Sequence, residues 1–149
     1  MVKIRIYVPI GVKNMHRAEG EDSQLVKSYV LLPLILSALE RDAKLISVHL
    51  RTPDPYLDLL SSASALATKD LAEVRKSMRR RGVKVYEQQR LPNGIEARFL
   101  CRGYHEQMLL LNDLIVAQGL ILMRKYLGLD ISAYSSYPDQ FRIPAGQDG

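Results

Sequence analysis

Residues 54–102 constrain the fold most, because a long amphipathic helix runs directly into a β-hairpin there. Small and apolar residues recur every three or four positions, which forms one stripe along about eight helical turns. The stripe consists of Leu57, Leu60, Ser64, Ala67, Leu71, Val74 and Met78. Gly82 follows it and is suited to end the helix in a left-handed conformation. The pattern predicts a helix over residues 54–81.

The start and the continuity of this helix depend on few residues. Asp54 is expected to cap it, and Pro55 suits the first helical position because the N–H that it lacks has no helical partner there. A break near residues 64–68 would give two helices, since Thr68 can cap the second. We favour the unbroken helix.

Two strands of alternating character follow. Val83 and Val85 share one face of the first strand, and the segment LPNG then predicts a tight turn. In that turn Pro92 fixes φ, and Gly94 is expected to supply a positive φ. A lone hairpin is marginally stable, so the alternating residues 2–8 are predicted to add a third strand.

Two further helices are predicted from apolar runs. The first begins with Asp22 or Ser23 as its cap and ends near residues 43–47, with a kink or break expected at Pro33. The second spans about residues 104–127.

The sequence therefore predicts an α+β domain over residues 1–128, with three long helices packed against a small antiparallel sheet, remotely like a winged helix. Residues 129–149 show no periodicity and are predicted to form an extended or disordered tail. The tail is expected to dock through Tyr134, Tyr137 and Phe141.

Few features point to chemistry or to a membrane. The three histidines are far apart, nucleotide-binding glycine motifs are missing, and the single cysteine, Cys101, excludes an internal disulfide. Cys101 and His105 are four residues apart, but Cys101 falls on the inferred buried face, which favours a structural cysteine. The longest apolar run, residues 108–123, is interrupted by polar residues and too short to span a bilayer. We expect a cytoplasmic protein with no catalytic residue, metal or cofactor.

The densest basic cluster lies where the long helix meets the hairpin. The net charge of +5 and the pI near 9.4 favour acidic partners. A helix followed by a hairpin with a basic outer face is also how a winged-helix domain contacts DNA. The residues predicted to contact DNA phosphates are Lys69, Lys76, Arg79, Arg80, Arg81, Lys84, Arg90 and Arg98.

Three other interpretations compete with this one. Asp70 and Glu73 interleave with the cations, which is typical of an ordinary solvated helix face. An acidic protein partner would need the same charges. Residues 29–36 and 108–123 carry more apolar surface than one amphipathic helix can cover, so the chain could instead be a dimeric helical scaffold with no nucleic-acid role. Our functional hypothesis is a non-enzymatic regulatory or accessory protein that contacts DNA. The alternative is a dimeric helical scaffold or a partner-binding protein with no nucleic-acid role.

The segments YVLLPLILSALERDAK, KDLAEVRKSMRRRGVKVYE and FLCRGYHE resemble small uncharacterised proteins of spore-forming Firmicutes. The resemblance covers roughly residues 29–106 and is not tied to a chemical motif. It implies a cytoplasmic bacterial protein and carries over no site residue.

Overall fold

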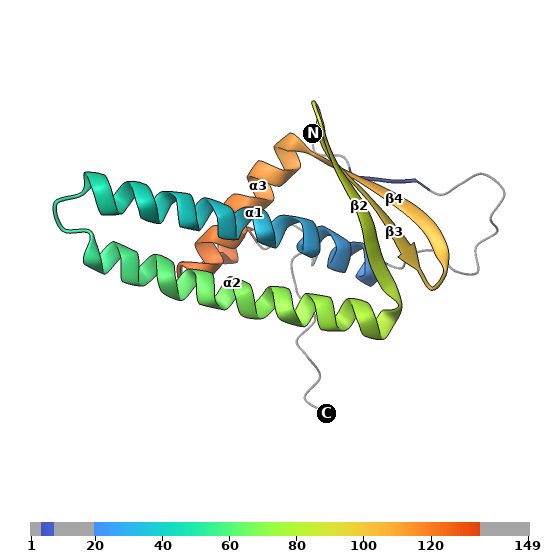
Figure 1. The fold of residues 1–149 in the computed structure, drawn as a ribbon, viewed down its shortest axis with the longest axis horizontal. Coiled ribbons are helices and arrows are strands. Elements are labelled where there is room, and N and C mark those ends of the chain that lie inside the picture. Colours follow the sequence, from blue (N-terminus) through green and yellow to red (C-terminus); the bar gives the residue numbers. More distant parts are fainter. Residues whose placement is uncertain (1–3, 8–19, 135–149) are drawn as a thin grey trace.

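A long helical hairpin and a four-stranded antiparallel sheet make up the fold (Figure 1). The structure, a computed structural model, describes residues 4–7 and 20–134. The elements in chain order are β1 (Ile4–Tyr7), α1 (Gly20–His49), α2 (Asp54–Arg81), β2 (Val83–Leu91), β3 (Gly94–Cys101), β4 (Tyr104–Leu111), α3 (Asn112–Tyr126) and a short 3-10 turn (Ser132–Tyr134). The predicted α+β class is confirmed. Tyr137 and Phe141, predicted to dock the tail, lie outside the described residues.

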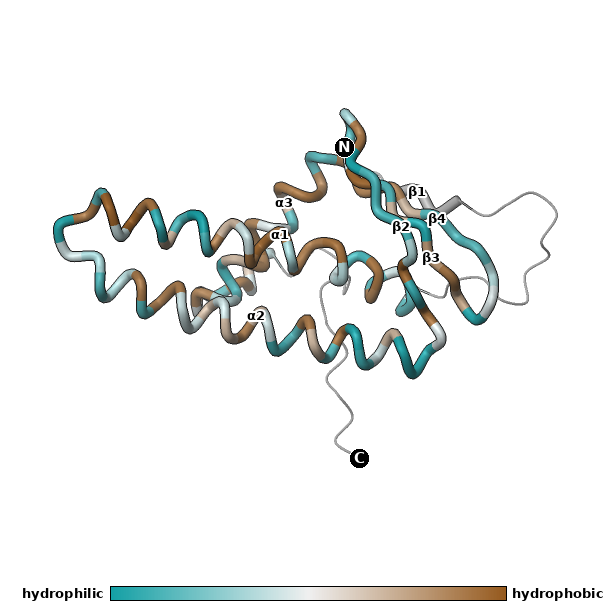
Figure 2. Tube along the Cα trace, in the orientation of Figure 1, coloured by the Kyte–Doolittle hydropathy of each residue, from teal (hydrophilic) through white to brown (hydrophobic). Residues whose placement is uncertain are grey.

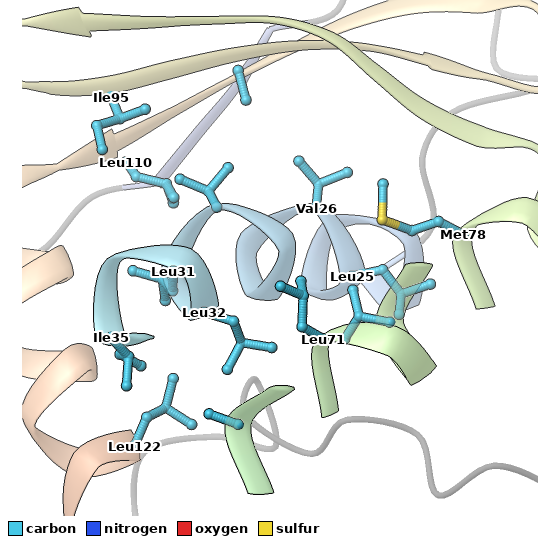
Figure 3. Packing of buried hydrophobic residues seen from close by; sticks show 14 of the residues in the cluster. Leu25, Val26, Leu31, Leu32, Ile35, Leu71, Met78, Ile95, Leu110 and Leu122 are labelled. Atoms are coloured by element: carbon cyan, nitrogen blue, oxygen red, sulfur yellow. The ribbon is translucent and has the colours of Figure 1, made fainter. Parts of the chain in front are cut away.

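The core lies around the first half of α1. Figure 3 shows this helix between the sheet and α2, with Val26 directed towards the strands and Leu25 towards α2 near Leu71. Ile35 lies near Leu122 of α3, which crosses the helical hairpin. Burial on several sides explains why this stretch of sequence is apolar all round. α1 continues unbroken through the exposed Pro33, so the break expected there does not occur.

α2 is one helix from Asp54 to Arg81, which confirms the unbroken prediction. Gly82 ends it with φ 69° and ψ 34°, and its N–H donates to the carbonyl oxygens of Arg79 and Met78. The predicted cap at the other end is wrong. Pro53 occupies the N-cap position without a side-chain cap bond, because Asp54 already lies within the first turn.

The sheet has the order β1-β4-β3-β2. β1 was predicted to join the β2–β3 hairpin directly, but it pairs with β4 instead. Residues 104–111, predicted to start the last helix, form β4, and β1 pairs with this strand. Arg102 (φ 49°) and Gly103 (φ 87°) make the tight turn that returns the chain antiparallel to β3. The residues of β4 alternate in burial, but the apolar run MLLL conceals that alternation in the sequence.

Gly94 serves a different purpose from the one predicted. Its φ is not positive, and a Cβ there would overlap the carbonyl oxygen of Leu110 on β4. Glycine is therefore required for the close approach of two backbones, while Pro92 and Asn93 form the turn. Asn112, the first residue of α3, donates from its backbone N–H to Asn93 O (3.0 Å) and from its side-chain amide to Pro92 O (2.9 Å).

The apolar surface is distributed unevenly along the helical hairpin. Figure 2 shows hydrophobic stretches on α1 and a hydrophilic end of α2 beside the sheet. Within residues 4–7 and 20–134, no helix is long and apolar enough to cross a membrane.

Replacing Gly94 with alanine is expected to lower the free energy of unfolding by about 1–3 kcal/mol or more, because the β3 and β4 backbones must separate. Gly119→Ala is the matched control, since a Cβ there meets nothing within 4 Å and alanine favours the helix. Urea denaturation of both variants measures the difference. Equal stabilities would contradict the close approach.

Candidate functional site

The exposed cations near the end of α2 form one surface. Lys69, Lys76 and Arg80 lie seven and four residues apart, so they align along the helix on the side opposite its buried stripe. We define the α2 outer face as Lys69, Arg75, Lys76, Arg79 and Arg80, all of which are exposed. From Lys69 to Arg80 this face extends about 16 Å along the helix axis.

The carboxylates that could neutralise this face do not do so. Asp70 is directed towards α3, where it accepts a hydrogen bond from the Tyr126 hydroxyl (2.7 Å) and lies 3.9 Å from Lys125 Nζ. Burial and this bond raise the pKa of Tyr126, so the hydroxyl remains a donor. Among the described residues, Glu73 makes no ion pair with Lys69 or Lys76. The outer face is thus less neutralised than the sequence indicated.

A shallow groove of about 230 Å³ adjoins this face where α1, α2 and β2 meet. Arg75, Arg79 and Lys84 line it with their basic groups, over a floor that includes Met78, Val83 and Val85. Tyr29 completes the wall, with the Arg75 guanidinium 5.9 Å from the centre of its ring. Sequence reasoning missed Tyr29, because it lies in an apolar run that otherwise belongs to the core.

Arg81, although predicted to bind nucleic acid, is part of an internal ion-pair network. Its Nε donates to Asp22 Oδ1 (2.6 Å), and its Nη1 lies 3.0 Å from Glu21 Oε2. Arg102 donates from Nη2 to the other oxygen of Asp22 (2.9 Å) and from Nη1 to the Arg81 carbonyl (3.0 Å). Asp22, predicted as a helix cap, is fully buried between the two guanidinium groups.

The hairpin residues of the predicted set are spread out. Arg98 forms ion pairs with Glu96 (3.0 Å) and Glu87 (3.7 Å), which offset its charge. Arg90 is exposed near the turn of the hairpin, about 20 Å along β2 from Lys84. The structure therefore brings together Lys69, Lys76, Arg79, Arg80 and Lys84, and separates Arg81, Arg90 and Arg98 from them.

Cys101 is a structural cysteine, as predicted. It is fully buried in the core and donates a weak hydrogen bond to Asp22 Oδ2 (3.6 Å). Burial, followed by the negative charge of Asp22, raises the pKa of its thiol to about 11. His105 pairs with Leu100 in the sheet and contacts the Tyr86 hydroxyl (3.1 Å) on the opposite face, so no thiol–imidazole pair forms.

Two other charged residues, Lys27 on α1 and Glu106 on β4, are buried in the core region. Loss of hydration lowers the pKa of Lys27 to about 8. In the part of the chain that the structure describes, no three histidine, cysteine, aspartate or glutamate side chains gather as a metal site would require.

Comparison with known proteins supports the resemblance noted in the sequence. A family model described as YhjD protein matches residues 17–131. The relative named Uncharacterized protein YhjD, from Bacillus subtilis (strain 168), is 31% identical over 114 residues, which cover 76% of this chain and 95% of that protein. No solved structure matches. Neither name states an activity, so no catalytic or binding residue carries over.

Replacing Asp22 with asparagine is expected to lower the free energy of unfolding by about 3 kcal/mol, because two guanidinium groups lose their buried counter-charge. The matched control is Glu21→Gln: this carboxylate is half exposed, so the loss is expected to stay below about 1 kcal/mol. Chemical denaturation provides both values. Equal losses of unfolding free energy in the two variants would show that the burial of Asp22 adds nothing to stability.

The rate at which the Cys101 thiol reacts with a disulfide reagent at pH 8 is expected to be limited by opening of the folded chain. A pKa of about 11 leaves about one thiol in a thousand ionised at that pH, and the sulfur is fully buried. Following the reaction with and without 6 M urea tests this, and the unfolded chain should react at the rate of a free thiol. Rapid labelling of the folded protein would contradict the buried position.

Proposed function

We propose that this chain, which belongs to the YhjD protein family, is a non-enzymatic accessory protein. In this proposal it contacts nucleic-acid phosphates through the α2 outer face. One observation carries the proposal: five exposed cations share this face, while Asp70 is directed inwards to Tyr126. The positive charge is therefore exposed to solvent, where it can replace counterions on a nucleic acid.

The dimensions of the face support this partner. One strand of duplex DNA carries a phosphate about every 3.4 Å along the axis, so about 16 Å of helix can lie along roughly five phosphates. Lys84 extends the surface onto β2 through the groove that it shares with Arg75 and Arg79. Such contacts supply affinity and orientation without reading the base sequence.

The proposed contact differs from that of a winged helix. α2 is 28 residues long and unbroken, whereas winged-helix recognition uses a short helix after a tight turn. Arg81 and Arg98 are engaged with carboxylates, and Arg90 lies towards the far end of β2, so none of the three is needed. The outer face of the helix carries the proposal, and the hairpin contributes Lys84.

The double substitution Lys76→Gln and Arg80→Gln tests this function. Each lost phosphate contact lowers the slope of log affinity against log salt by about 0.9, so the slope for duplex DNA should become shallower by about 2. Fluorescence anisotropy of a labelled duplex between 50 and 200 mM salt measures it.

The matched control removes the same charge from the opposite end of the helical hairpin, through Lys44→Gln and Arg51→Gln, two exposed residues. This pair should leave the slope unchanged. An equal effect of both pairs would mean that net charge alone drives the binding. No binding even at 20 mM salt would reject nucleic acid as the partner.

A further inference from the structure

The groove between α1, α2 and β2 has features that phosphate binding alone does not require. Its floor is apolar: Met78 and Val83 are each 4% exposed, and Val85 packs against the core. Tyr29 adds an aromatic ring to its wall. Of the described residues that line the groove, three are basic and none is acidic. The groove therefore suits an anion that also carries a flat, apolar group.

The folded core fixes the shape of this groove. Gly82 turns the chain from α2 into β2, and its N–H donates to the carbonyl oxygens of Met78 and Arg79. Val83 then pairs with Cys101 of β3 as β2 begins. The floor is thus formed before a ligand arrives, which lowers the cost of ordering the site on binding.

The cations at the rim are not neutralised by carboxylates. Within residues 4–7 and 20–134, no ion pair involves Arg75, Arg79 or Lys84. The Arg75 guanidinium also lies over the Tyr29 ring, 5.9 Å from its centre. Nucleic-acid bases stack on aromatic rings and on guanidinium planes. A phosphate and a neighbouring base would therefore both find complementary groups here.

We infer that this groove takes one unpaired base of a single-stranded nucleic acid, whose adjacent phosphates contact Arg79 and Lys84. The inference rests on the proposed function, because Arg75 and Arg79 belong both to the α2 outer face and to the groove. A strand whose phosphates follow that face is thereby led to the groove.

The size of the groove and the geometry of a duplex both favour a single strand. About 230 Å³ is less than the roughly 300–1,000 Å³ of sites for drug-sized ligands, and it suits a single base. A base inside a duplex cannot use the apolar floor, because its two faces are covered by the neighbouring base pairs. It would first have to leave the stack, which costs free energy.

Fluorescence anisotropy at 200 mM salt tests the inference with three labelled probes. They are a single strand of about twelve nucleotides, the duplex that it forms with its complement, and an abasic strand of the same length. Phosphate contacts alone favour the duplex, because its charge density is the highest of the three. With a base in the groove, the ordinary single strand should bind about tenfold more tightly than the abasic strand, and more tightly than the duplex.

Substitutions of tyrosine separate the ring from the charges. Tyr29→Leu should remove most of the advantage of the ordinary strand over the abasic one, whereas Tyr29→Phe should keep it. Tyr56→Leu is the matched control, because Tyr56 is 50% exposed at the start of α2 and does not line the groove. Affinity for the duplex should be the same in all three variants. Circular dichroism identifies a variant that fails to fold, and the comparison of strands on the wild-type chain needs no variant.

The outcomes distinguish this inference from the proposed function. Equal affinity for the ordinary and the abasic strand would overturn the groove as a base site and leave phosphate binding by the α2 outer face intact. If no probe binds even at 20 mM salt, both are rejected. A peptide of glutamate and leucine whose binding is weakened by Tyr29→Leu, while the two strands bind equally, would assign the groove to an acidic protein instead.

Discussion

The burial of Asp22 is the constraint on which the junction of the fold depends. Its carboxylate is fully buried near the start of α1, whereas Arg81 ends α2 and Arg102 lies in the turn between β3 and β4. Removing a carboxylate from water costs several kcal/mol unless its lone pairs are satisfied. Two guanidinium groups at 2.6 and 2.9 Å offset that cost only when all three segments are in place, so the network favours one arrangement of helices and sheet.

This junction also determines which part of the helical hairpin projects. The network holds the sheet against the first half of α1, and α3, only 15 residues long, crosses the hairpin further along (Figure 1). The outer half of α1 then has α2 on one side and solvent on the other. On that open side Leu45 is 52% and Val48 76% exposed, so apolar surface at the end of α1 faces solvent.

The sequence predicted the parts of the fold that local patterns determine. The apolar stripe and Gly82 define α2, and the segment LPNG locates the hairpin. β4 was missed because four apolar residues in succession conceal a period of two. The reason for Gly94 was also missed, since the carbonyl that excludes a Cβ belongs to Leu110, sixteen residues away in the chain and adjacent only after the sheet has formed.

The charges of the candidate site were likewise predictable only where they depend on local sequence. Spacing along α2 correctly aligned Lys69, Lys76 and Arg80, because helical periodicity is a local property. Which charges are neutralised depends on distant residues: Tyr126 draws Asp70 inwards, and Asp22 removes Arg81 from the basic set. Folding therefore sorts the charges of this part of α2: Asp70 and Arg81 are engaged by other elements, and five cations stay exposed. Five of the 21 lysines and arginines of the chain are thereby exposed on about three turns of one helix.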